Sequence, residues 1–99
     1  MAMNYKILID KKADKFLKSL EKTQKRDFEK MLFFLHNILE NASDPCTLPN
    51  ARKLQGFSDN RYRWRLGDYR VIGKVGNGEF KIIQIIKIAK RDDSTYKGL

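Results

Sequence analysis

Four arginines, Arg61, Arg63, Arg65 and Arg70, fall within ten residues of a chain whose other basic residues are mostly lysines. The first three alternate with aromatic or apolar residues, a pattern typical of a strand with one buried and one cationic face. Alternate residues on one face of a strand lie about 6.6 Å apart. Guanidinium groups bind phosphate through paired donors and stack on bases. The spacing therefore predicts a stiff row of groups suited to binding single-stranded RNA.

Arg70 stands just beyond a turn signal, Gly67-Asp68, which would fold a strand over 69–75 back onto the strand over 61–66. Arg70 would then lie near the arginine row, although the sequence leaves its face open. The same alternation also fits the solvated side of any half-buried sheet. The concentration of arginine over lysine in this segment favours a binding role.

Composition limits the classes of function. The 99 residues suffice for a single domain, 1–99, and the 41% of hydrophobic residues can build one core. The 21 basic and 12 acidic side chains give a net charge of +9, which attracts polyanions such as nucleic acid. One cysteine, Cys46, and one histidine, His36, cannot form a zinc site unaided. We expect a cytoplasmic protein with no metal, no small-molecule cofactor and no membrane partner.

Hydrophobic spacing predicts an α+β fold. A strand over 5–9 is followed by two amphipathic helices, the first beginning at Lys11 and the second near Thr23. An apolar stripe on the second helix comprises Phe28, Met31, Leu32, Leu35, Ile38 and Leu39. A loop over 41–50 leads toward strands over 61–66, 69–75 and 79–88, joined by close turn signals. The expected architecture is an N-terminal strand, a two-helix hairpin and a three-stranded antiparallel meander.

Four ordered segments carry a family resemblance: Lys53-Leu54-Gln55-Gly56, Tyr62-Arg63-Trp64-Arg65-Leu66, Gly67-Asp68-Tyr69-Arg70-Val71, and Ile88-Ala89-Lys90-Arg91 with Tyr96. Together they resemble the RelE branch of the RelE/ParE toxin superfamily. The resemblance implies a βααβββ fold and a type II toxin–antitoxin system. It further implies an endoribonuclease that cleaves messenger RNA in the ribosomal A site and is held inactive by a cognate antitoxin.

The resemblance also assigns roles to residues. The catalytic set that it implies is Arg63, Arg65, Arg70, Arg91 and Tyr96. The RNA-binding set is Arg61, Lys53, Lys74 and Lys90. The RNA 2′-hydroxyl would attack the adjacent phosphorus while arginines stabilise the phosphorane charge. Arginine, with a pKa above about 12, is a poor general base, so the proton acceptor stays open, with Tyr96 as a hypothesis.

Two other functions fit the same features. A ParE-like toxin would inhibit gyrase through protein contacts without nuclease activity, and a plain nucleic-acid-binding module would have no catalysis at all. Retention of Arg70, Lys90, Arg91 and Tyr96 favours the nuclease, because a gyrase-binding protein does not need that complete set. His36 lies in the second predicted helix, away from the basic strands, and is not expected to act as a base.

Overall fold

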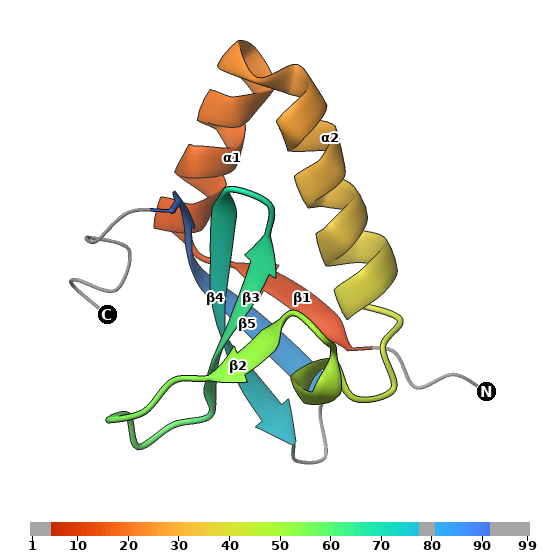
Figure 1. Cartoon of the computed structure of the whole chain (residues 1–99), viewed down its shortest axis with the longest axis vertical. Helices are drawn as coiled ribbons and strands as arrows, with labels where there is room; N and C mark the ends of the chain where they lie inside the picture. The colour runs from red at the N-terminus through yellow and green to blue at the C-terminus, as the bar shows by residue number, and fades with distance from the viewer. Residues whose placement is uncertain (1–4, 78–80, 92–99) are drawn as a thin grey trace.

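A five-stranded sheet forms one layer of the molecule, and two helices pack on one of its faces (Figure 1). This computed structural model describes residues 5–77 and 81–91. Its elements are β1 (Lys6–Ile9), α1 (Lys11–Thr23), α2 (Lys25–Phe33), η1 (Phe34–Leu39), η2 (Pro45–Thr47), β2 (Ala51–Lys53), β3 (Arg61–Leu66), β4 (Tyr69–Asn77) and β5 (Lys81–Lys90). None of the described helices is long and apolar enough to cross a membrane. The α+β class and the helical hairpin are confirmed.

The sheet differs from the prediction in strand number and in direction. It has five strands in the order β1-β5-β4-β3-β2, and β1 runs parallel to β5, so the sheet is mixed. The strand missing from the prediction is β2, which pairs antiparallel with β3. Its three residues, Ala51–Lys53, are too few to show an alternating pattern. The last strand, Lys81–Lys90, continues two residues past the predicted end at 88, while residues 79 and 80 lie outside the described part of the chain.

Helix α1 forms because its apolar residues recur on one side. Ala13, Leu17 and Leu20 are buried, while lysines cover the opposite side. Asp10 occupies the position before the helix, but its side chain makes no cap hydrogen bond. Its carboxylate instead accepts a hydrogen bond from Nε2 of Gln84 at 2.9 Å, which ties the start of α1 to β5.

The second helical segment changes its winding after Phe33. Residues Phe34–Leu39 form a π-helical stretch, in which the wider turn shifts side chains relative to an α-helix. Phe34 at the start of this stretch is buried, whereas Ile38 within it is 39% exposed. The prediction that Ile38 belongs to the apolar stripe is therefore wrong, because that stripe assumed α-helical spacing throughout.

The core lies between the helices and the sheet, and Trp64 of β3 is fully buried there. Its indole N–H donates to the carbonyl oxygen of Pro45 at 3.0 Å, which fastens the η2 segment to the sheet. Gly73 of β4 lies against the indole ring, and a Cβ at that position would come within 3.1 Å of Trp64 Cζ3. This close approach fixes β3 against β4 and so fixes the strand that carries the arginines.

Candidate nucleic-acid interface

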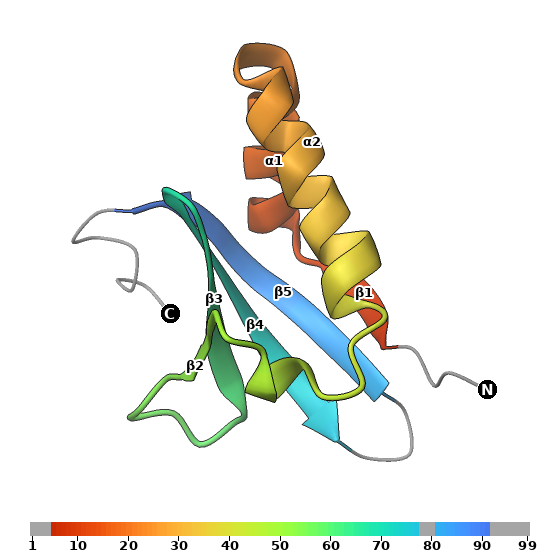
Figure 2. The ribbon, with the colours of Figure 1, turned by 45° about the vertical axis from the view of Figure 1, so that its right-hand side comes forward.

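Helices α1 and α2 lie against one face of the sheet (Figure 2). The arginines of β3 lie on the other face. Trp64 points into the core, so Arg63 and Arg65 point the other way. Arg63 is paired with Arg52 of β2 on one side and with Ile72 of β4 on the other. Ile72 is in turn paired with Lys87 of β5. Directly paired residues share a face. This surface, here termed the basic face, includes Arg52, Arg61, Arg63, Arg65, Arg70, Lys74 and Lys87.

A β-bulge determines which residues of β5 join the basic face. Ile72 of β4 pairs with Lys87, but the next residue of β4 pairs with Ile85, so Ile86 is an extra residue. Ile85 and Ile88 are both buried, three positions apart. Strict alternation from Ile85 would have turned Lys87 into the core. The bulge instead places Lys87 beside Ile72. The apolar side chain of Ile72 gives the aliphatic parts of Lys87 and Arg63 a surface to pack on.

Three arginines lie at the β3–β4 turn, one from β3, one from β4 and one just after β5, and we term them the arginine cluster. Arg65 is paired directly with Arg70. Arg70 is only 5% exposed, and its Nη1 donates to the carbonyl oxygens of Gly67 at 3.1 Å and Tyr69 at 2.9 Å. Arg91 follows β5, and its backbone N–H donates to a carbonyl oxygen of the same turn at 2.6 Å. The turn therefore brings together residues that lie up to 26 positions apart in the chain.

The cluster combines a fixed charge with accessible ones. Backbone carbonyls hold the Arg70 guanidinium in place, so its charge needs no reorientation when a phosphate arrives. Arg65 and Arg91 are exposed and can present their donors outward. Such an arrangement can bind a phosphate and stabilise additional negative charge on it.

At the other end of β3 the positive charge is partly neutralised. Arg61 is paired with Lys74 across the strands, and both interact with Asp59. Arg61 Nε donates to the two carboxylate oxygens at 2.9 and 3.2 Å, and Lys74 Nζ lies 3.6 Å from the carboxylate. Burial by itself would raise the pKa of Asp59. The hydrogen bond and positive charge of Arg61, followed by those of Lys74, outweigh burial, so the pKa of Asp59 is lowered. The Arg61 guanidinium also lies 4.2 Å from the centre of the Phe57 ring.

Solved structures share this architecture over nearly the whole chain. A chain of the archaeal RelE–RelB complex from Pyrococcus horikoshii OT3 is 39% identical, with a TM-score of 0.71 over 92% of this chain and 99% of its own length. The chain belongs to the RelE-like toxin superfamily. No protein-family model and no curated protein matches it.

Two further RelE-like structures share the fold at 18% identity. A chain of the RelBE2 toxin–antitoxin complex from Mycobacterium tuberculosis aligns with a TM-score of 0.70, over 90% of this chain and all of its own. A chain of the YoeB dimer from Staphylococcus aureus aligns with a TM-score of 0.66, over 90% of this chain and 98% of its own. The fold thus persists where most residues differ.

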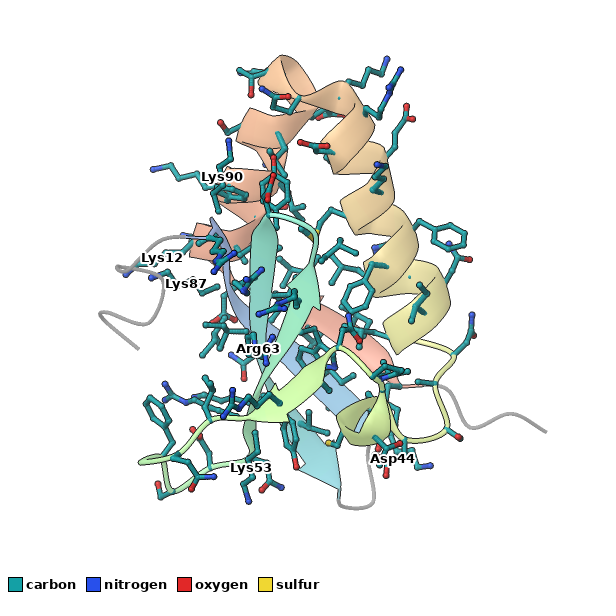
Figure 3. All side chains as sticks on the ribbon, in the orientation of Figure 1. Lys12, Asp44, Lys53, Arg63, Lys87 and Lys90 are labelled. Atoms are coloured by element: carbon teal, nitrogen blue, oxygen red, sulfur yellow. The ribbon has the colours of Figure 1, made fainter. Side chains whose placement is uncertain are left out.

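Some residues that the RelE-like resemblance selected do not lie on the basic face. Lys53 is paired with Tyr62, and Lys90 with Tyr69, so strand alternation turns both away from the basic face. In Figure 3 Lys90 lies near α1, whereas Lys53 lies by β2, far from α1 and α2. Tyr96 lies outside the described residues. Sequence reasoning missed Arg52 and Lys87 as members of the face. Arg52 required the short strand β2 to be recognised, and Lys87 required the bulge.

The described tyrosines are poor candidates for the RelE-like general base. Burial, followed by the hydrogen bond to Asp27, raises the pKa of Tyr69 to about 12. Interaction with Cys46, followed by burial, raises the pKa of Tyr62, and burial raises that of Tyr5. All three phenols therefore stay protonated at neutral pH.

The histidine and the cysteine are placed no better for catalysis. His36 lies on the π-helical segment, with Nδ1 3.3 Å from Glu40 Oε2, rather than on the basic face. Burial, as the largest cause, raises the pKa of the Cys46 thiol, which makes it a weaker nucleophile.

Proposed function

We propose that this RelE-like chain is the toxin of a toxin–antitoxin pair and cleaves messenger RNA in the A site of cytoplasmic ribosomes, without a metal or cofactor. The observation that carries the proposal is the arginine cluster. Guanidinium groups that bind phosphate in pairs are the groups that a phosphoryl-transfer site needs when no metal assists. Arg65 of β3 pairs directly with Arg70 of β4, and Arg91, just after β5, hydrogen-bonds to the same turn through its backbone N–H.

The reaction begins when the 2′-oxygen of one ribose attacks the adjacent phosphorus. The P–O5′ bond breaks, and the products are a 2′,3′-cyclic phosphate and a free 5′-hydroxyl. Negative charge grows on the non-bridging oxygens, and Arg65 and Arg70 would donate to them. A preorganised donor of this kind contributes roughly 10²–10³ in rate.

The remaining roles go to the neighbours of the cluster. Arg91 would neutralise the departing 5′-oxygen, which takes a proton from water to become the 5′-hydroxyl. Arg63, two residues before Arg65 on β3, would hold the RNA backbone. The resemblance offers Tyr96 as the acceptor of the 2′ proton, and this residue lies outside the described part of the chain. Arg52 and Lys87 would contact flanking phosphates on the basic face. Lys74 shares the Asp59 carboxylate with Arg61, and Lys53 and Lys90 are turned away from this face.

An antitoxin partner follows from the same assignment. Two of the similar structures are toxin–antitoxin complexes, one of RelE with RelB and one named RelBE2. A protein with a net charge of +9 and a basic face suits a partner with an acidic segment. Such a segment bound over the arginine cluster would exclude RNA and inhibit the toxin.

Primer extension on messages in a translating extract tests the proposal. We expect cleavage by the parent chain, and a loss of about 10²–10³ in the rate for Arg65→Ala, because Arg65 is an exposed member of the cluster. Arg26→Ala, which removes an exposed arginine from α2, is the matched control and should cleave like the parent. Thermal unfolding of each variant confirms that it remains folded.

Three outcomes would contradict parts of the proposal. Full cleavage by Arg65→Ala would remove the arginine cluster from the mechanism. Cleavage that stops with EDTA and returns with Mg²⁺ in a ribosome-free assay would show that a metal takes part. Absence of cleavage together with inhibition of gyrase supercoiling would favour a ParE-like activity.

A further inference from the structure

The loop between β2 and β3 holds an aromatic side chain in a defined position. Gly56 has φ +86°, a left-handed conformation that turns the chain just before Phe57. The backbone N–H of Leu54 donates to the carbonyl oxygen of Arg61 at 2.9 Å, which closes the base of the loop. The Arg61 guanidinium then lies 4.2 Å from the centre of the Phe57 ring. The ring is therefore held by a closed loop and a stacked cation.

The Phe57 ring has no role in the hydrophobic core. The ring is partly exposed, and Phe57 is absent from the described hydrophobic residues that pack on the core. Its stacking partner Arg61 lies on the basic face, directly paired with Lys74. An aromatic ring is thus presented at the margin of a surface that otherwise carries cations.

The chemistry at this margin is unlike that of the arginine cluster. Arg61 is 15% exposed and gives its Nε–H to both oxygens of Asp59, and Lys74 lies near the same carboxylate. A phosphate is a poor ligand here because the carboxylate would repel it and already occupies these cations. The partly exposed Phe57 ring instead suits the face of a nucleobase, because bases stack on aromatic rings.

We infer that Phe57, held by Arg61 and Asp59, is a base-stacking platform for single-stranded RNA on the basic face. The inference rests on the proposed function and adds a base-recognition position to it. Arg61 and Arg65 are four residues apart on β3, which is roughly 13 Å along the strand. The stacked base therefore belongs to a nucleotide near the scissile phosphate but not to the phosphate that the arginine cluster holds.

Fluorescence of 2-aminopurine tests the inference without cleavage. A set of short single-stranded oligonucleotides is made with 2′-deoxy sugars, which cannot undergo 2′ attack, and with 2-aminopurine at successive positions. Stacking on an aromatic ring quenches this base. We expect the parent chain to quench it strongly at one position, and Phe57→Ala to lose that quenching and to bind with a Kd weaker on the order of tenfold.

Two variants separate stacking from a change in fold or charge. Phe57→Trp keeps an aromatic platform and should retain the quenching. Phe33→Ala removes a phenylalanine that is 58% exposed on α2, and it should bind and quench like the parent. Undiminished quenching in Phe57→Ala, or no quenching by the parent at any position, would overturn the inference.

Failure of the inference and failure of the proposed function are distinguishable. If the parent cleaves messages and Arg65→Ala does not, while Phe57→Ala still quenches like the parent, the platform is refuted and the nuclease stands. If the parent quenches at one position through Phe57 but never cleaves in translating extract, the platform stands and the nuclease is refuted.

Discussion

The hydrogen bond between Tyr69 and Asp27 offers a sharp test of how the helices are held to the sheet near the arginine cluster. The Tyr69 hydroxyl donates to Asp27 Oδ2 at 2.7 Å, which joins β4 to the first turn of α2. The Tyr69 ring is 8% exposed and packs edge-on against Phe16, with ring centres 6.1 Å apart. Tyr69→Phe keeps the ring contact and removes only the hydroxyl.

A hydrogen bond to a charged group contributes about 1.5–3 kcal/mol to the free energy of unfolding. For a chain of this size about 2 kcal/mol corresponds to a fall in Tm of roughly 10 °C. We therefore expect Tyr69→Phe to unfold about that much earlier at pH 7. Asp27→Ala removes the acceptor, so the double variant should be less destabilised than the sum of the two single variants.

The pH dependence of this bond has a definite sign. The folded-state pKa of Tyr69, about 12, lies above its ordinary value of 10.0, since burial and Asp27 disfavour the phenolate. The stabilisation is fully present below pH 10 and is lost as pH rises toward 12. Urea unfolding of parent and Tyr69→Phe should show a difference in free energy that shrinks across this window. Equal stability at pH 7, or a difference unchanged at pH 12, would refute the reasoning.

The remaining predictions concern the sheet and its basic face. Gly73→Ala should destabilise the chain by about 1–3 kcal/mol in urea unfolding, because its methyl group would displace the Trp64 ring. Asp59→Asn should lower the free energy of unfolding at neutral pH. This deficit should shrink below pH 3.8, the ordinary pKa of the group, and disappear as pH falls through the lower pKa that Asp59 has in the folded chain. Lys87→Ala should reduce the slope of log K against log salt for single-stranded RNA by about 0.7, whereas Lys22→Ala on α1 should leave the slope unchanged.

The parts of the fold that follow from periodicity were predictable. Hydrophobic spacing predicted α1, in which Ala13, Leu17 and Leu20 are buried. The alternation around Trp64 predicted β3 and its buried face. Both depend only on local geometry, which the sequence records directly. The π-helical turn at Phe34–Leu39 and the parallel pairing of β1 with β5 were not predicted, because tertiary packing decides them.

In the candidate site, too, some features were predictable from the sequence and others were not. Alternation was enough to place Arg63 and Arg65 together, and the turn signal was enough to bring Arg70 near them. The burial of Arg70 and its hydrogen bonds to backbone carbonyls could not be predicted from the sequence, because they depend on the shape of the folded turn. The Asp59 contact that occupies Arg61 depends equally on how the loop before β3 closes.

The bulge in β5 shows that strand register, and not only the number of basic residues, decides which side chains form the basic face. From Ile85 onward, strict alternation would bury Lys87 and expose Ile88, which would cost both the desolvation of a charge and the loss of an apolar contact. One extra residue, Ile86, avoids both penalties, and Lys87 joins the basic face as a consequence. Deleting Ile86 should remove the bulge but leave Lys87 on the basic face, because Lys87 then follows Ile85 directly and simple alternation turns it outward. Lys87→Ala removes only the cation, so comparing the two variants separates the effect of register from that of charge.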